Sequence, residues 1–315
     1  MFYSSEQTLK ENQLAINDFY KESLYKAYLD TTNGQLFYAY AIPNDAKAAI
    51  VLSTGRLEGL DKYKELLWEL YNNGYAVFIS DHQGQGRSYR VLKNKHKGYV
   101  SQFHDYSADF DFFNQQVVDV NWQGKKVLVS HSMGGAIAFD YLSNYKHTFC
   151  GAFLSAPMFD IHTHGIPKLL AKLIAATATK LGFQYSYALG QSDYSVEEFA
   201  LNTLTSSDLR YQLFRETYQA EPLLQLGGVT YGWLNATFKF IASMDKLNVT
   251  IPVYIASAGN DAVVDNSAQY KLAQRHQHIT LENIEGAKHE LFFERDAIRH
   301  LVLKNLYQFC DAVTA

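Results

Sequence analysis

Short apolar runs alternate with segments of helical periodicity along the first half of the chain. Each run is mostly apolar throughout, as in strands that are buried on both faces. The four runs are 48–53, 76–80, 126–130 and 150–155. Apolar residues recur at helical spacing from Asp61 to the residue before Gly74, over 104–119 and over 133–145. This alternation predicts βαβ units and a mainly parallel sheet.

The pattern differs on either side of this region. Residues 22–42 form two extended segments around Asn33-Gly34, a dipeptide typical of tight hairpin turns. Residues 160–240 show no pattern of buried strands and have helical stretches near 167–174 and 209–218. Alternation resumes with strands at 251–256 and 278–284 and helices at 266–275 and 295–311. We therefore expect one α/β domain, built from residues 1–159 and 241–315, with a helical cap insert over 160–240.

Composition and charge narrow the class of protein. Hydrophobic residues make up 47% of the chain and charged residues 19%, the balance of a folded globular protein. The formal net charge of -4 argues against nucleic-acid binding through a basic surface. No stretch approaches the ~20 apolar residues that span a bilayer, and residues 1–7 lack the pattern of a signal peptide. The only cysteines, Cys150 and Cys310, form no disulfide framework, so we expect a cytoplasmic protein, with peripheral contact at the inner face of the membrane left open.

One serine lies where a parallel sheet presents a nucleophile. Ser132 belongs to Ser130-His131-Ser132-Met133-Gly134-Gly135, between the strand predicted at 126–130 and the helix predicted at 133–145. A sharp strand-to-helix turn lifts a serine hydroxyl above the sheet edge and needs small neighbours. Gly134 and Gly135 supply them on one side, while Ser130 replaces the first glycine of the usual G-x-S-x-G pattern. A chance loop is the alternative, but the setting favours a nucleophile.

A serine nucleophile needs a histidine base and an orienting carboxylate, which follow it in the chain order Asp or Glu, then His, in enzymes built on such a sheet. His289 follows the last predicted strand, in Gly286-Ala287-Lys288-His289-Glu290, and is the expected base. Asp261 follows the strand at 251–256 and is the expected acid, with Asp265 as a competitor whose other role is to cap the next helix. The histidines excluded by order or position are His82, His104, His131, His162, His164, His276, His278 and His300.

Two backbone amides are expected to hold the oxyanion of an ester transition state. One belongs to Met133, directly after the nucleophile, and the other to Arg56, in the loop after the 48–53 strand. The side chain of Arg56 has two candidate roles, an ion pair with Glu58 or contact with an acidic group of the substrate. This chemistry needs no metal or other cofactor, and we expect none.

Further motifs carry a family resemblance. They are 53–58 (STGRLE), 81–88 (DHQGQGRS), 154–159 (LSAPMF), 227–233 (GGVTYGW) and 263–266 (VVDN), together with the serine and histidine motifs. With these motifs the chain resembles, over roughly residues 20–311, the bacterial lysophospholipases and their monoacylglycerol lipase relatives. The resemblance implies the α/β-hydrolase fold, a triad on Ser132, Asp261 and His289, and a helical cap that approaches membranes or micelles. Thr54 stands where monoacylglycerol lipases usually carry histidine, which favours the lysophospholipase branch.

We therefore expect hydrolysis of the carboxylic ester of a single-chain lipid, a lysophospholipid or a monoacylglycerol, through an acyl-enzyme on Ser132. Two other functions stay open. A peptidase of the same fold would need an acidic pocket for an ammonium group, for which Asp193, Glu197 and Glu198 are candidates. A non-catalytic ligand-binding member would typically lack a triad residue, and none is missing.

The insert carries an apolar stripe that admits two interpretations. Leucines and aromatic residues over 169–187 are interspersed with Lys168, Lys172 and Lys180. Such a stripe suits contact with an anionic membrane surface. Packing of the stripe onto the sheet domain is the favoured interpretation.

Overall fold

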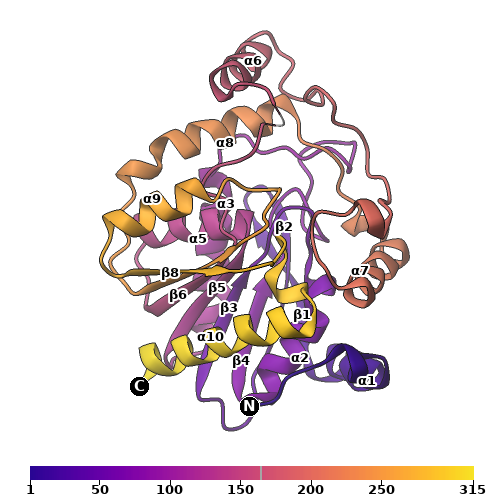
Figure 1. The fold of residues 1–315 in the computed structure, drawn as a ribbon, viewed down its shortest axis with the longest axis vertical. Coiled ribbons are helices and arrows are strands. Elements are labelled where there is room, and N and C mark those ends of the chain that lie inside the picture. The colour runs from indigo at the N-terminus through magenta and orange to yellow at the C-terminus, as the bar shows by residue number, and fades with distance from the viewer. Residues whose placement is uncertain (164) are drawn as a thin grey trace.

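An eight-stranded sheet runs through the centre of the computed structural model, which describes residues 1–163 and 165–315 (Figure 1). The strands lie in the order β1-β2-β4-β3-β5-β6-β7-β8. Their bounds are β1 (Tyr25–Thr31), β2 (Gly34–Ala41), β3 (Ala48–Ser53), β4 (Tyr75–Ser80), β5 (Lys126–His131), β6 (Phe149–Ser155), β7 (Val253–Ala258) and β8 (Ile279–Ile284). His164, which the sequence analysis assigns to the insert, lies outside the described residues.

The sheet is antiparallel at one edge and parallel elsewhere. β1 and β2 form a hairpin in which Thr31 pairs with Gly34, as the Asn33-Gly34 turn predicts. β2 is also antiparallel to β4, whereas each neighbouring pair from β3–β4 to β7–β8 is parallel. The prediction of a mainly parallel sheet is confirmed. The carboxyl ends of its parallel strands share one edge, which is where such folds place their sites.

Helices cover both faces of the sheet (Figure 1). The longer ones are α1 (Glu6–Asp18), α2 (Lys64–Asn72), α3 (His104–Phe113), α5 (Met133–Asn144), α6 (Lys168–Lys180), α7 (Asp208–Ala220), α8 (Tyr231–Ser243), α9 (Ser267–Arg275) and α10 (Asp296–Thr314). Shorter helical turns are η1 (Phe19–Ser23), η2 (Leu60–Tyr63), η3 (Asn114–Val118), α4 (Asp119–Asn121), η4 (Phe199–Leu201), η5 (Pro222–Leu224), η6 (Met244–Lys246) and η7 (Leu291–Phe293).

Two hydrophobic cores form because the strands are apolar on both faces. In β3, Ala49 and Val51 face one core, whereas Ile50 and Leu52 face the other. The first core includes side chains of α3, α5, α8 and α9. The second includes side chains of α2 and α10. The result is a three-layer arrangement with the sheet in the middle.

The chain between β6 and β7 leaves the sheet and later returns to it. The described residues of this segment form α6, α7 and α8 and add no strand to the sheet. α6 packs on α8 and lies at the top of Figure 1, away from the sheet. It buries only Ala175, whereas Leu169 is 81% exposed and Leu173 is 61% exposed. The interpretation that this apolar stripe packs on the sheet domain is therefore wrong for α6.

Among the residues that the structure describes, no helix combines the length and the apolar character needed to cross a bilayer.

Candidate active site

Ser132 occupies a strained turn between β5 and α5. Its backbone has φ 52° and ψ -120°, a positive φ that non-glycine residues rarely adopt. Such strain costs of the order of 1–3 kcal/mol and persists only where neighbouring contacts impose it. Here the Ser132 amide donates to the carbonyl of Ser155 on β6 at 2.9 Å, and the Ser132 carbonyl accepts from the amide of Met158 at 2.9 Å. The turn therefore holds the hydroxyl at the carboxyl edge of the sheet.

The residues that follow Met133 must be small because α5 starts directly against the end of β3 and the loop after β6. A Cβ added to Gly134 would lie 2.1 Å from the carbonyl oxygen of Ser53, and one on Gly135 would lie 2.6 Å from Cβ of Pro157. On the other side, Ser130 fits where glycine is usual. Its hydroxyl is buried and has no hydrogen-bond partner among the described residues.

Three side chains from three loops meet at this turn. Nε2 of His289 lies 2.9 Å from Oγ of Ser132, and Nδ1 of His289 lies 2.7 Å from Oδ2 of Asp261. If Nδ1 carries the proton and donates to the carboxylate, Nε2 is left to accept the serine proton. The structure thus brings together the serine, the base and the acid expected from the sequence.

Asp261 is held as a charged acceptor. Burial raises its pKa, but the hydrogen bond and charge of His289 and the amides of Val264 and Val263 outweigh this effect, so its pKa is lowered. Those amides donate to Oδ1 at 3.0 and 2.8 Å. Both carboxylate oxygens are therefore occupied, which fixes the direction in which Asp261 meets the imidazole.

The loops that carry the acid and the base are joined by backbone hydrogen bonds. The amide of Gly259 donates to the carbonyl of Ile284 at 2.9 Å, and the amide of Asn260 donates to the carbonyl of Ala287 at 2.8 Å. Gly286 turns the chain between these contacts with φ 73°. The distance between Asp261 and His289 therefore depends on two paired loops and not on side chains alone.

Asp265, the competing acid, is used elsewhere. One oxygen accepts from the ammonium of Lys168 on α6 at 2.6 Å, and the other accepts from the amide of Ser267 at 3.0 Å. The second contact is the helix-capping role that the sequence offered as its alternative. The first ties the insert to the loop after β7.

The two expected oxyanion amides are unoccupied. Neither the amide of Arg56 nor that of Met133 donates a hydrogen bond to any described residue. The loop that carries Arg56 is tightly held, with Leu57 at a positive φ of 67°. Gln85 donates from its side chain to the carbonyls of Gly55 and Glu58 at 2.7 and 2.9 Å. A preorganised pair of free amides is what a developing oxyanion requires.

A buried ionic network supports this loop, and the sequence analysis did not find it. Glu58 accepts from the amide of Gly55 and from the hydroxyl of Tyr63. The ammonium of Lys62 lies 2.6 Å from Glu58 and 2.7 Å from Glu290, the residue after the expected base. Burial raises the pKa of Glu58, but Lys62 above all outweighs burial and lowers it. The i,i+4 spacing of Glu58 and Lys62 was a visible signal for one pair, whereas Glu290 is joined only by folding.

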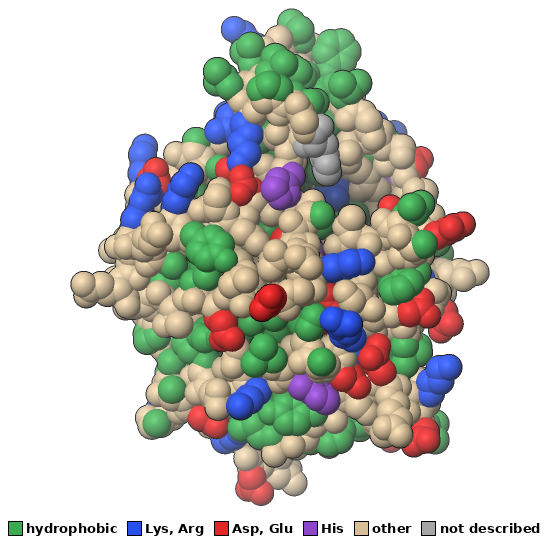
Figure 2. Space-filling model, in the orientation of Figure 1, with side chains coloured by type: hydrophobic (Ala, Val, Ile, Leu, Met, Phe, Trp, Pro, Cys, Tyr) green, Lys and Arg blue, Asp and Glu red, His purple; other side chains and the backbone are tan. Residues whose placement is uncertain are grey.

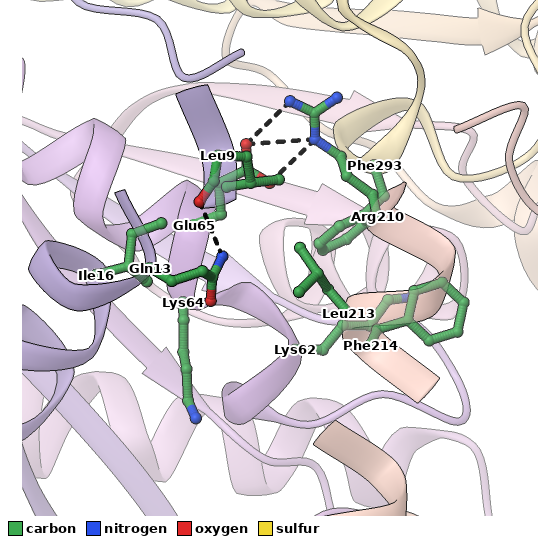
Figure 3. A pocket seen from close by; sticks show the side chains of 10 residues that line it. All are labelled: Leu9, Gln13, Ile16, Lys62, Lys64, Glu65, Arg210, Leu213, Phe214 and Phe293. Carbon is green, nitrogen blue, oxygen red and sulfur yellow. Dashed lines mark hydrogen bonds and ion pairs between the residues drawn. The ribbon is translucent and has the colours of Figure 1, made fainter. Parts of the chain in front are cut away.

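Lys62 is one of the residues that line a small cavity of about 60 Å³ beside α7 (Figure 3). Its ammonium lies 4.8 Å from the ring centroid of Phe214 and 4.6 Å from that of Phe293. These rings keep water from the ion pairs, which strengthens the attraction between the charges.

The ring of His131 packs beside the expected base, with its centroid 4.8 Å from that of His289. Burial lowers the pKa of His131 to about 3, against the opposing charge of Glu58. The ring is therefore neutral at pH 7 and adds no positive charge next to His289.

The side chain of Arg56 differs from one expectation. It does not pair with Glu58, whose partners are given above; its Nη2 donates to the carbonyl of Gly227 at 2.5 Å. Its guanidinium carbon lies 5.4 Å from the ring centroid of Trp233 on α8. The prediction of an ion pair between Arg56 and Glu58 is therefore wrong. The second candidate role of the Arg56 side chain, contact with an acidic group of the substrate, stays a prediction.

The fold, the strained serine turn and the chain order of the three side chains are those of the α/β-hydrolases, and the protein is a hydrolase of this class. Within it, the chain belongs to the family described as serine aminopeptidase, S33, whose profile matches residues 44–296. The resemblance drawn from the motifs is confirmed.

Relatives of known name fall on two branches. The chain is 34% identical to lysophospholipase L2 of Escherichia coli (strain K12) over 275 residues, which cover 82% of this chain and 79% of that protein. It is 28% identical to the monoglyceride lipase of Homo sapiens over 298 residues, 91% of each chain. Among solved structures, a soluble variant of the Saccharomyces cerevisiae monoglyceride lipase with a substrate analog shares the fold, with a TM-score of 0.72, 20% identity and coverage of 92% of this chain and 96% of that one.

Proposed function

We propose that the protein hydrolyses the carboxylic ester of a single-chain lipid, with Ser132 as nucleophile. The observation that carries this proposal is the hydrogen-bonded chain from Ser132 through His289 to Asp261, next to two free backbone amides. Lysophospholipases and monoglyceride lipases, the named relatives, share substrates with one acyl chain, and this common feature supports the substrate class.

The geometry supports an acyl-enzyme mechanism. His289 accepts the hydroxyl proton of Ser132 as Oγ attacks the ester carbonyl, and the amides of Arg56 and Met133 donate to the oxyanion. The bond to the alcohol then breaks, and His289 gives the proton to the leaving oxygen. In the second half, His289 deprotonates a water that attacks the acyl-enzyme, which releases the fatty acid and restores Ser132. Asp261 orients the imidazole and stabilises its charged form.

We assign the 160–240 insert the role of a cap that contacts a lipid surface. Leu169, Leu173 and Leu181 are exposed by 61% to 81%. Hydrophobic side chains gather at the top of the molecule in Figure 2, where Figure 1 places α6. Leu173 and Leu181 also line an open apolar groove of about 520 Å³. Its lining residues are Leu173, Ile174, Thr177, Ala178, Leu181, Phe183 and Tyr231. A soluble protein rarely exposes so many large apolar side chains together without a partner, and an interfacial substrate supplies one.

The alternative of a peptidase that binds a free ammonium group is less well supported. Of its candidate acids, Asp193 accepts from the hydroxyl of Tyr187 and the side-chain amide of Asn94, and Glu197 and Glu198 are exposed. The buried carboxylates Glu58 and Glu290 share the ammonium of Lys62. The guanidinium of Arg56, which has no carboxylate partner among the described residues, would repel a cationic substrate group that approached it.

A substrate panel tests the proposal. The purified protein is incubated with a lysophospholipid, a monoacylglycerol and an aminoacyl p-nitroanilide, and fatty acid and p-nitroaniline are measured. We expect fatty acid from at least one lipid and no p-nitroaniline. Release of p-nitroaniline without fatty acid would contradict the proposal and support a peptidase.

A further inference from the structure

Arg56 carries a partly buried guanidinium that lacks a carboxylate partner. Its Nη2 donates to the carbonyl of Gly227, while Nε is buried and has no partner among the described residues. No described carboxylate lies within ion-pair distance of Arg56. The two most buried arginines differ in this respect: Arg210 pairs with Glu65 at 3.0 Å, and Arg299 pairs with Glu69.

An unpaired cation in such surroundings is costly. Burial lowers the pKa of Arg56 to about 10, although the oxygens of Tyr106 and Tyr187 oppose this effect. The side chain is therefore still charged at pH 7, and part of its hydration has been lost without an anion in exchange. A site that keeps an uncompensated cation is suited to receive an anionic group from a ligand.

The same residue contributes a backbone amide to the proposed oxyanion hole. Its guanidinium can therefore lie no further from that amide than the length of one arginine side chain. In a glycerophospholipid with an acyl chain on the terminal hydroxyl, the carbonyl and the phosphate are separated by a chain of bonds of similar length. An ester carbonyl at the Arg56 amide thus leaves the phosphate within reach of the Arg56 side chain.

The surroundings of the guanidinium hold it in one place. Trp233 lies beside it, and Gly98 lies against it: a Cβ added to Gly98 would be 2.6 Å from Nη2 and 3.2 Å from Nε. Glycine at position 98 therefore makes room for the planar group. A guanidinium fixed in this way can offer N–H groups other than the buried Nε to a phosphate, with little loss of conformational entropy.

We infer that Arg56 is a headgroup-binding residue, which pairs with the phosphate of a single-chain glycerophospholipid and so selects it over the uncharged monoacylglycerol. This inference rests on the proposed function and names its substrate class. The arginine would act on substrate choice through its side chain and on the oxyanion through its backbone.

The test compares two substrates with the same acyl chain in the same detergent micelles. kcat/KM is measured for a lysophospholipid and for a monoacylglycerol with the wild-type protein, Arg56→Gln and Arg56→Lys. A charge-assisted hydrogen bond contributes about 10- to 100-fold in affinity, so we expect Arg56→Gln to lower the ratio of lysophospholipid to monoacylglycerol kcat/KM by about that factor. Arg56→Lys keeps the positive charge but lacks the planar guanidinium. Its ratio of lysophospholipid to monoacylglycerol kcat/KM should lie between those of the wild-type protein and Arg56→Gln.

A second measurement needs no variant. Glycerol 3-phosphate should inhibit monoacylglycerol hydrolysis by the wild-type protein competitively, whereas glycerol at the same concentration should not. An equal loss of kcat/KM on both lipids in Arg56→Gln, or no inhibition by glycerol phosphate, would overturn the inference and leave Arg56 as a clamp on Gly227. If the wild-type protein hydrolyses neither lipid, the proposed function itself fails, and this inference fails with it.

Discussion

The ammonium of Lys62 lies 2.6 Å from the carboxylate of Glu58, inside the protein and next to the loop that carries the free amide of Arg56. Its second partner, Glu290, follows the expected base His289 directly in the chain. One buried cation thus connects the loop of Arg56, whose amide would stabilise the oxyanion, with the loop of His289, which would transfer the proton. The side chains of Lys62, Glu58 and Glu290 are 2%, 3% and 6% exposed, so water cannot replace a missing partner.

Lys62→Met tests this connection. It leaves two carboxylates buried without their cation, so we expect the free energy of unfolding to fall by about 3 kcal/mol or more and kcat to fall with it. Urea unfolding and ester hydrolysis measure the two effects. Lys64→Met is the matched control, because Lys64 is more exposed and lies 3.8 Å from Asp61; its loss should stay below about 1 kcal/mol. Equal effects of the two substitutions would contradict the role given to Lys62.

The serine turn allows a matched comparison at the two positions that flank it. Gly134→Ala places a methyl group against the carbonyl of Ser53, so the helix and the oxyanion loop must move apart. We expect a loss of about 1–3 kcal/mol in stability and a fall in kcat of about 10-fold or more, because a small displacement of reacting groups is costly. Circular dichroism during urea unfolding and steady-state kinetics measure the two losses.

Ser130→Ala is the companion variant. It removes a buried hydroxyl that has no described partner, so stability should rise slightly, by about 1 kcal/mol, and hydrolysis should stay close to that of the wild-type protein. A loss of activity like that of Gly134→Ala would show that the Ser130 hydroxyl has a role that the geometry does not reveal.

Variants of two aspartates four residues apart test which of them is the acid that orients His289. Asp261→Asn keeps the shape of the side chain but favours the wrong tautomer of His289, and we expect kcat to fall by about 10⁴-fold. Asp265→Asn loses an ion pair with Lys168 at a partly exposed site and should change kcat only a few-fold. The kinetics of both variants on one soluble ester provide the comparison. A larger loss in Asp265→Asn would reverse the assignment.

Much of the fold was predictable because its signals are local. Strands such as β3 and β5 are mostly apolar and are buried along their whole length, and the chain order of Ser132, Asp261 and His289 selected the expected site before any contact was known. α1 escaped the prediction because only Leu9 and Ile16 of its thirteen residues are buried, which leaves too weak an apolar pattern. The helix expected over 104–119 is present, but regular α-helix ends at Phe113. The chain continues through the wider helical turn η3 into α4.

The parts that were missed depend on contacts between distant segments. Nothing in the sequence joins Glu290 to Lys62 or places the guanidinium of Arg56 beside Trp233. The helical spacing of apolar residues in α6 was predicted correctly. Such spacing shows that one face of a helix is apolar, but it does not show which part of the protein, if any, packs against that face. The exposure of Leu169 and Leu173 could therefore come only from the structure.

The proposed lipid contact of the cap predicts a surface-specific effect. Leu169→Asn with Leu173→Asn should weaken association with vesicles of anionic phospholipid by 10-fold or more, since each leucine contributes about 1.5–3 kcal/mol when it leaves water. Hydrolysis of a short, soluble ester should change little. Co-sedimentation and a soluble-ester assay measure the two. Leu14→Asn with Val120→Asn, at residues 72% and 69% exposed on other helices, is the control; an equal effect there would contradict a role specific to the cap.

The most direct test of the whole account is fatty-acid release from a lysophospholipid or a monoacylglycerol by Ser132→Ala. The wild-type protein and the variant are compared at equal concentration, and thermal unfolding shows that the variant is folded. Because the proposed mechanism forms the acyl-enzyme on the hydroxyl of Ser132, we predict a loss of about 10⁶-fold in kcat, down to the background of the assay. Hydrolysis by a folded Ser132→Ala protein at the rate of the wild-type protein would contradict the assignment of Ser132 as the nucleophile.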